Sequence, residues 1–586
     1  EVLMDIVGSV EAPTDDFDTR VMIFNHGCGQ CHATDYDVGH ALPPEGAPLY
    51  RSRYLEGAVA CESCHGPGSV HAEWHRAPGD GDGAAARLLH PRRDLDAKGV
   101  LESCGRCHYQ HEWRYAIDDD PRASFHDIAI TQAYDQGGFF ADGRLDGLRY
   151  HGTTQSQSAC FEKGDMSCLS CHRMHGGKRW AMKWEENDDA QCTQCHEAGT
   201  YAAKTHTFHD AVACVDCHMP KLLGRERVLH FMRDHSIRNP MPELTERFGS
   251  DHAPNACNVC HAERTAGWSR EWKEKWWGSG GREAVDAMAL GVGLVVDLRN
   301  DPGRVDTARL SALAADAAQK RFFRLTALRE LGRRPGPEAA AVLRSLLGDP
   351  DPEVVQLVLA GLEERPDPAS GPALMKLLDH PTRPVRVDAA WALARIGWRG
   401  EGEGTGRLWG ATEAMLVRQG HFTAFLRRIV EIADAVGRFD ESSRYLKELV
   451  RVAPAVALDG LHRRARRLTE EGRHEDALLA YGEVRRALPE GADAAVQILF
   501  IDSADSLAAA GETNAAAGNW AHALSNFTPG GVLHVIAESR LRALQGDRAE
   551  AERRLRELEA KLAEAPWNRE MLRRVRWSLK VVRGTG

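Results

Sequence analysis

The cysteines constrain this chain more than any other feature. All fifteen lie within the first 260 of 586 residues, and fourteen of them form seven Cys-x-x-Cys pairs. Histidine follows every pair, so the chain carries seven copies of Cys-x-x-Cys-His. The paired cysteines are Cys28, Cys31, Cys61, Cys64, Cys104, Cys107, Cys168, Cys171, Cys192, Cys195, Cys214, Cys217, Cys257 and Cys260. The motif histidines are His32, His65, His108, His172, His196, His218 and His261.

This spacing is typical of covalent haem attachment. Two thiols three positions apart reach the two vinyl groups of one porphyrin, and the adjacent histidine then lies under the iron as an axial ligand. Cys₄ zinc sites need an even number of pairs and no fixed histidine, and a thioredoxin-like motif occurs once rather than seven times. We therefore predict seven covalent haem c groups. Cys160 lies outside the motifs, and we expect it to be a buried thiol.

Seven haems leave up to seven further axial positions to fill. The first 261 residues hold fourteen histidines outside the motifs, so histidine is the economical sixth ligand and methionine its rival. This surplus favours bis-histidine haems of low potential. We take as candidate distal ligands His26, His71, His151, His175, His206, His209, His235 and His252. The other six histidines are His40, His75, His90, His111, His126 and His230.

Charge and hydropathy limit the partners. Residues 1–268 contain 26 Lys+Arg and 40 Asp+Glu, a net charge of −14, and the total of −11 leaves +3 for the remainder. An acidic haem region disfavours nucleic acid and favours a basic redox partner drawn by long-range attraction. The chain has no apolar run of 18 residues, so we expect no transmembrane segment. Haem attachment to thiols implies an exported bacterial or archaeal protein, periplasmic or extracellular, whose signal peptide was either removed or not included in this chain.

The cysteine-free remainder contains repeats. Leu346–Val355 recurs 31 residues later as Leu377–Arg386, which is typical of HEAT repeats. Gly437–Pro454 recurs 35 residues later as Gly472–Pro489, a period close to that of tetratricopeptide repeats. Before them, Trp residues spaced by four predict a helix lying on the haem region. Stacked helical hairpins form a solenoid, and we expect this one to bind protein.

Several segments resemble a known family. Residues 214–221, 234–240 and 257–261 resemble the end of the cytochrome c nitrite reductase family, and residues 61–69 and 168–175 resemble the wider group that includes hydroxylamine oxidoreductase and its tetrahaem electron acceptor. The resemblance implies a mostly helical scaffold with closely stacked haem pairs, and a distal role for His235, His71 and His175. Nitrite reductases carry lysine in the motif of the catalytic haem. All seven motifs here end in histidine, which argues against ammonia-forming nitrite reduction.

We therefore expect a mainly α protein: a multihaem cytochrome c domain with little regular sheet, followed by an α-solenoid of helical hairpins. The expected parts are a seven-haem domain (1–268), connecting helices (269–315), HEAT-like repeats (316–400) and tetratricopeptide-like repeats (411–586). The predicted function is electron transfer through seven haems, with the repeats for protein docking. Two alternatives stay open. One is an enzyme acting on a small nitrogen or sulfur compound at one open haem, and the other is a structural subunit of a larger redox complex or haem filament. An oligomer is compatible with each, and no catalytic residue is singled out.

Overall fold

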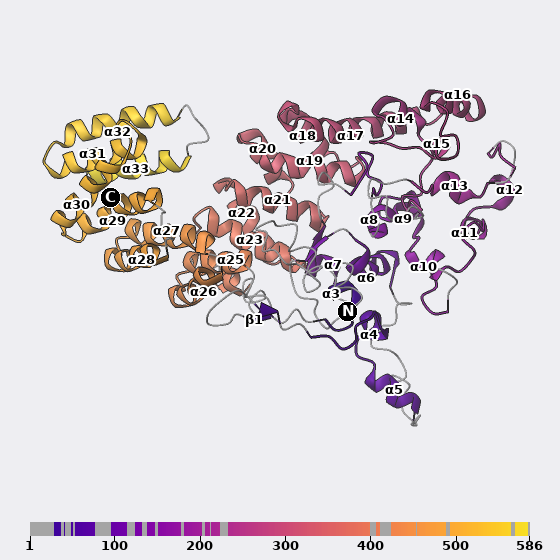
Figure 1. The fold of residues 1–586 in the computed structure, drawn as a ribbon, viewed down its shortest axis with the longest axis horizontal. Helices are drawn as coiled ribbons and strands as arrows, with labels where there is room; N and C mark the ends of the chain where they lie inside the picture. Colours follow the sequence, from indigo (N-terminus) through magenta and orange to yellow (C-terminus); the bar gives the residue numbers. More distant parts are fainter. Residues whose placement is uncertain are drawn as a thin grey trace. The chain divides into compact units, whose positions relative to one another are not determined.

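The computed structural model is mainly helical, which confirms the expected fold class. Figure 1 labels its elements. The chain divides into two compact units, residues 1–396 and 397–586, and each is considered by itself. None of the described helices is long and apolar enough to cross a membrane. The described residues are 29–36, 40–41, 49–50, 53–76, 95–109, 111–113, 124–131, 138–146, 150–176, 181–201, 206–210, 212–222, 233–398, 406–410, 423–452, 454–487, 493–563 and 569–583.

The first 260 residues form short helices joined by long irregular segments. The helices are α3 (Gly29–His32), α4 (Cys61–His65), α5 (Ser69–Arg76), α6 (Ala97–His108), α7 (Phe125–Ile128), α8 (His151–Gln155), α9 (Ala159–Gly164), α10 (Cys168–Cys171), α11 (Ala190–Thr193), α12 (Ala198–Tyr201), α13 (Cys214–His218), α14 (Pro242–Phe248) and α15 (Ala256–Cys260). Most of the Cys-x-x-Cys-His motifs coincide with one of these short helices or with the end of α6. The regular structure of this part is therefore organised around the motifs.

Regular sheet is sparse in the described residues, as expected. Strand β1 (His40–Ala41) pairs antiparallel with β2 (Leu49–Tyr50), and β3 (His111–Trp113) pairs antiparallel with β4 (Ala129–Thr131). Beside the second ribbon, Leu101, Tyr109, Phe125 and Ala129 form a small buried apolar cluster. This cluster joins the end of α6 to α7 and β4.

Longer helices begin with α16 (Ala266–Trp277) and α17 (Arg282–Asn300). The predicted tryptophan helix is thus present as α16. Its start is capped by Thr265, whose side chain accepts a hydrogen bond from the backbone N–H of Trp268 at 3.1 Å. Its end is set by Gly278, which adopts a φ of 73° that favours glycine. Helix α16 packs on α14 and α15.

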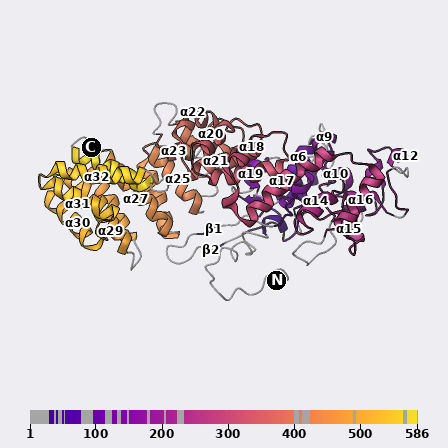
Figure 2. The same ribbon diagram turned by 90° about the horizontal axis from the view of Figure 1, so that it is seen from above.

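The HEAT-like region continues the first unit. Its helices are α18 (Thr307–Ala315), α19 (Arg321–Arg333), α20 (Pro337–Ser345), α21 (Pro352–Glu364), α22 (Gly371–Leu377) and α23 (Arg383–Arg395). Helix α21 begins at an Asp-Pro pair. The side chain of Asp351 accepts a hydrogen bond from the backbone N–H of Glu353 at 2.9 Å, and Pro352 occupies the first helical position. Helices α19, α21 and α23 pack side by side (Figures 1 and 2).

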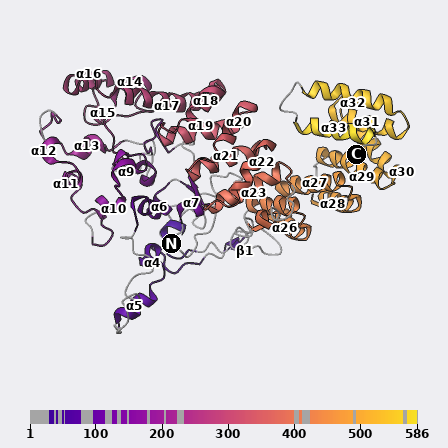
Figure 3. The same cartoon turned by 180° about the vertical axis from the view of Figure 1, so that it is seen from behind.

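The HEAT-like helices also contact the motif-bearing part. The rings of Phe139 and Phe322 lie 6.1 Å apart, and both side chains are buried. The carboxylate of Asp127 accepts from the backbone N–H of Arg383 at 2.8 Å. Helix α7 accordingly lies beside α23, as Figure 3 also shows. The two regions therefore share one packed unit, so the repeats fix the position of the segment that carries β3, α7 and β4.

The second unit is an array of paired helices. They are α25 (Thr423–Ala435), α26 (Phe439–Val452), α27 (Pro454–Glu470), α28 (His474–Ala487), α29 (Asp493–Ala509), α30 (Thr513–Asn526), α31 (Val532–Leu544), α32 (Arg548–Ala563) and α33 (Arg569–Arg583). Consecutive helices pack against each other. Ala477, Ala523 and Ala551 are fully buried at the helix contacts, because their small side chains let the paired helices approach closely.

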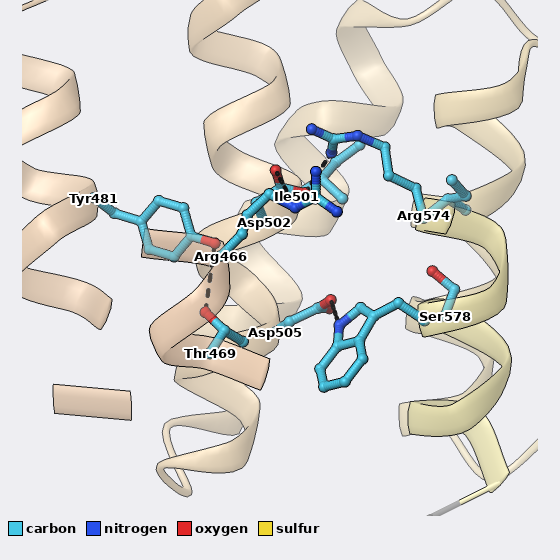
Figure 4. A pocket seen from close by; sticks show the side chains of 10 residues that line it. Arg466, Thr469, Tyr481, Ile501, Asp502, Asp505, Arg574 and Ser578 are labelled. Atoms are coloured by element: carbon cyan, nitrogen blue, oxygen red, sulfur yellow. Dashed lines mark hydrogen bonds and ion pairs between the residues drawn. The ribbon is translucent and has the colours of Figure 1, made fainter. Parts of the chain in front are cut away.

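A buried ionic network joins the last helices of this unit (Figure 4). Asp502 pairs with Arg574 at 2.6 Å and with His462 at 2.6 Å. Burial alone would raise the pKa of Asp502, but the charge of Arg574 and the hydrogen bond with His462 outweigh it and hold that pKa well below its usual range. The next turn of α29 places Asp505 against Arg540 at 2.7 Å. Asp502, Asp505 and Arg574 line a small cavity of about 20 Å³ together with Tyr481 and Trp577.

Candidate haem-binding sites

The fourth, fifth and seventh motifs share one backbone geometry. The N–H of the motif histidine donates to the carbonyl of the first cysteine, at 2.9 Å for His172, 3.0 Å for His196 and 2.9 Å for His261. This is one helical turn, and residues three apart in a helical turn lie on the same face. Both thiols of a motif therefore point to one side, as attachment of a single porphyrin requires. Cys28 and His26 lie outside the described residues.

Cysteines of different motifs lie close together. Such neighbours are Cys107 with Cys31 and Cys64, Cys168 with Cys104, Cys171 with Cys192 and Cys195, Cys192 with Cys214, and Cys217 with Cys257 and Cys260. The third motif thus adjoins the first and second, and from the third onward each motif adjoins the next. The attachment points follow one another in space in nearly their order along the chain.

Cys160 lies beside this line of thiols. Burial raises its pKa, and the thiol of Cys195 adds to that effect. Cys160 is half-buried. The prediction of a buried thiol therefore overestimated how far this residue is buried. Its position on α9, near the fourth and fifth motifs, explains the partial exposure, because the segments around those motifs are irregular and leave much of their surface open.

Four motif histidines each face a histidine from outside the motifs. The distances between ring centroids are 5.9 Å for His65 and His175, 6.4 Å for His172 and His235, 6.1 Å for His218 and His206, and 6.3 Å for His261 and His209. An iron about 2 Å from each ligating nitrogen would hold two imidazole centroids roughly 6 Å apart. The spacing and the donor atoms therefore fit an iron between each pair.

Backbone carbonyls orient two of these rings. The Nδ1 of His235 hydrogen bonds with the carbonyl of Arg233 at 2.9 Å, and the Nδ1 of His218 does the same with the carbonyl of Arg238 at 3.3 Å. A donor bond from Nδ1 fixes the tautomer and leaves Nε2 as the metal-binding nitrogen. Arg233 is itself held by Asp216 at 3.0 Å. The segment 233–238 is therefore tied directly to the sixth motif.

A cluster of imidazoles surrounds the third and fourth motifs. The His151 ring lies 4.5 Å from the His235 ring. Gly152 approaches the third motif so closely that an added Cβ would lie 3.1 Å from the carbonyl oxygen of His108. Burial, with smaller contributions from His235 and His108, lowers the pKa of His151 to about 2. His151 is therefore neutral, the form that binds metal.

The remaining candidates have other surroundings. The His71 ring meets that of His75 at 4.5 Å, and His252 is half-buried in the turn after α14, where its N–H donates to the carbonyl of Gly249 at 3.2 Å. His32 is exposed. The Tyr201 ring lies edge-on to the His196 ring at 5.2 Å.

Sequence reasoning missed two aromatic residues near the paired histidines, Phe208 and Tyr201. The Phe208 ring stacks on Trp276 at 4.7 Å, and Tyr201 lies edge-on to His206 at 5.2 Å. The run of tryptophans in α16 was noticed, but its contact with residues 206–209 was not. The sequence contains a signal for the position of Phe208 near the paired histidines, because this residue lies between two candidate ligands in a short His-x-Phe-His segment.

Comparisons with known families agree with this chemistry. The model of cytochrome c554 and c-prime matches residues 12–66, the doubled CXXCH motif matches residues 159–200, and HEAT repeats match residues 307–394. No curated protein and no solved structure matches the chain. The chain is therefore a multihaem c-type cytochrome, an electron-transfer protein with covalently attached haem c and HEAT repeats.

Proposed function

We propose that this protein carries seven covalent haems, most of them with two histidine ligands, and conducts electrons along them. The observation that carries the proposal is the set of four imidazole pairs with centroids 5.9–6.4 Å apart, each joining one motif histidine to one histidine from outside the motifs. The neighbouring cysteines of successive motifs add support, since closely spaced attachment points favour rapid electron exchange.

The side chains have separate roles in this proposal. Paired cysteines attach each haem, the motif histidine binds one face of its iron, and the facing histidine binds the other. Backbone carbonyls such as that of Arg233 hold the ligand rings in place. The haems, when bound, supply reversible one-electron chemistry whose potential depends on ligand, burial and hydrogen bonding.

Distal candidates can also be named for the first, third and fifth motifs. His151 is the candidate for the third motif, because Gly152 adjoins the backbone of His108. His26, His71 and His252 are candidates for the others. We propose that the haem region extends over residues 1–268 and is related to the nitrite reductase and hydroxylamine oxidoreductase group.

The partner is proposed to be a basic redox protein. HEAT repeats generally interact with proteins, and the net charge of −14 over residues 1–268 complements a basic surface. The helical pairs of residues 411–586 are proposed to be tetratricopeptide-like and to add to the docking surface. Haem attachment to reduced thiols favours an exported protein, periplasmic or extracellular.

A second candidate function is catalysis at the fifth motif. Within the described part of the chain, the Tyr201 ring lies edge-on to His196 at 5.2 Å, which leaves no space for an iron between these two rings. An open sixth position at this haem would allow a small nitrogen or sulfur compound to bind. Tyr201 would then border the site without ligating the iron.

Ligand binding by the reduced protein distinguishes the two functions. A conductor with every iron closed gives low-spin spectra and binds no carbon monoxide. An enzyme with one open haem binds one equivalent, and His196→Met should alter the spectrum of that species alone. A protein in which most haems bind carbon monoxide would contradict the bis-histidine proposal.

A further inference from the structure

One short segment carries two of the paired histidines. The His206 ring faces that of His218 at 6.1 Å and 6°, and the His209 ring faces that of His261 at 6.3 Å. Although only three positions separate His206 and His209, they face histidines of two different motifs, the sixth and the seventh. Any displacement of residues 206–209 would therefore disturb both pairs.

The end of α16 contacts each part of this segment. The indole N–H of Trp277 donates to the carbonyl oxygen of His206 at 3.1 Å. The Trp276 ring stacks on Phe208 at 4.7 Å with an interplanar angle of 7°, and it meets the His209 ring edge-on at 5.6 Å. Trp277 thus contacts His206, and Trp276 contacts His209. The Phe208 ring packs against both indoles.

Helix α16 is firmly attached to its surroundings. Lys273 pairs with Glu243 of α14 at 2.9 Å, and the hydroxyl of Ser269 donates to the Asn258 side chain at 3.0 Å. Asn258 belongs to the short helix α15 of the seventh motif. The two indoles are consequently fixed relative to the same motif whose histidine His209 faces.

We propose that Trp276 and Trp277 are positioning residues that clamp residues 206–209, keeping His206 and His209 on the irons of the sixth and seventh haems. The inference rests on the proposed bis-histidine ligation. Without the indole of Trp276, the ring of His209 loses its edge-on aromatic contact, so dissociation from iron becomes more favourable. An aromatic contact of this kind corresponds to roughly a tenfold change in that equilibrium.

Carbon monoxide titration of the reduced, full-length haem protein tests the clamp. His209→Ala and His206→Ala should each add one haem that binds carbon monoxide. Trp276→Ala should raise the apparent affinity of the seventh haem for carbon monoxide roughly tenfold, and Trp277→Ala should do so for the sixth. Trp276→Phe retains a ring for stacking and should restore most of the wild-type behaviour. Trp184→Phe, away from α16, is the matched control.

The outcomes separate the clamp from the ligation on which it rests. If the histidine variants open a haem but the two tryptophan variants behave as wild type, the clamp is refuted and the ligation stands. If neither histidine variant opens a haem, the ligation itself is refuted. Equal effects of Trp276→Ala and Trp184→Phe would mean general loosening and would also overturn the clamp. Redox titration of the same variants gives a second measure, because a lost histidine raises the potential of that haem.

Discussion

The buried aspartate of the second unit offers a quantitative test of the repeat array. Asp502 lies between Arg574 of α33 and His462 of α27, each at 2.6 Å, and the Asp502 and Arg574 side chains are only 9% and 8% exposed. Asp502→Asn keeps the shape of the side chain but removes the carboxylate charge that pairs with the buried guanidinium of Arg574. Such a loss costs about 3–5 kcal/mol. For a unit of this size, that corresponds to a fall in melting temperature of roughly 10 °C.

Thermal unfolding followed by far-ultraviolet circular dichroism measures this change, and the haem absorbance reports on the first unit separately. The effect should depend on pH. Because the folded pKa of Asp502 lies below its unfolded value, its contribution is present above about pH 4 and is lost as the pH falls through the folded pKa. Glu557→Gln, which removes an exposed pair with Arg553, is the control and should change stability by less than about 1 kcal/mol. A melting temperature of Asp502→Asn within about 2 °C of wild type would refute this account of the network.

Three further predictions concern the first unit. Gly143→Ala should lower the free energy of unfolding of the first unit by about 2 kcal/mol, because the φ of 85° disfavours alanine and the added Cβ would lie 2.9 Å from Phe322. Gly280→Ala is the control. A Cβ there meets nothing within 4 Å, so this change should alter the melting temperature little. His175→Ala should create one haem that binds carbon monoxide, because His175 faces His65. The control variant His522→Ala, in the second unit, should create none. Equal carbon monoxide binding by the two variants would contradict the pairing of His175 with His65. Stopped-flow electron exchange with a basic monohaem cytochrome should slow as salt rises, and a rate independent of ionic strength would contradict electrostatic steering by the acidic region.

The local features followed from the sequence. The seven motifs, the tryptophan helix and the Asp-Pro helix starts are set by residues close together in the chain. Four of the eight candidate distal histidines each face a motif histidine; they are His175, His206, His209 and His235.

The pairing itself could not be derived. His235 faces His172 of the fourth motif, although it follows the sixth motif and its segment is tied to that motif by backbone hydrogen bonds from Asp234 to Pro220 and from Arg238 to His218. Likewise, Trp276 meets Phe208 across 68 residues of chain. Such contacts depend on how the irregular segments pack, and periodicity carries no information about them. The half-burial of Cys160 was missed for the same reason.

The haem content of the purified chain tests the central claim most directly. The pyridine haemochrome absorbance, divided by the protein concentration from amino-acid analysis, gives the number of haems per chain. Attachment at every Cys-x-x-Cys-His motif predicts seven, and substitution of one motif, as in Cys168→Ser with Cys171→Ser, should reduce the value to six. Four or fewer in the intact protein, or no change in that double variant, would contradict the account.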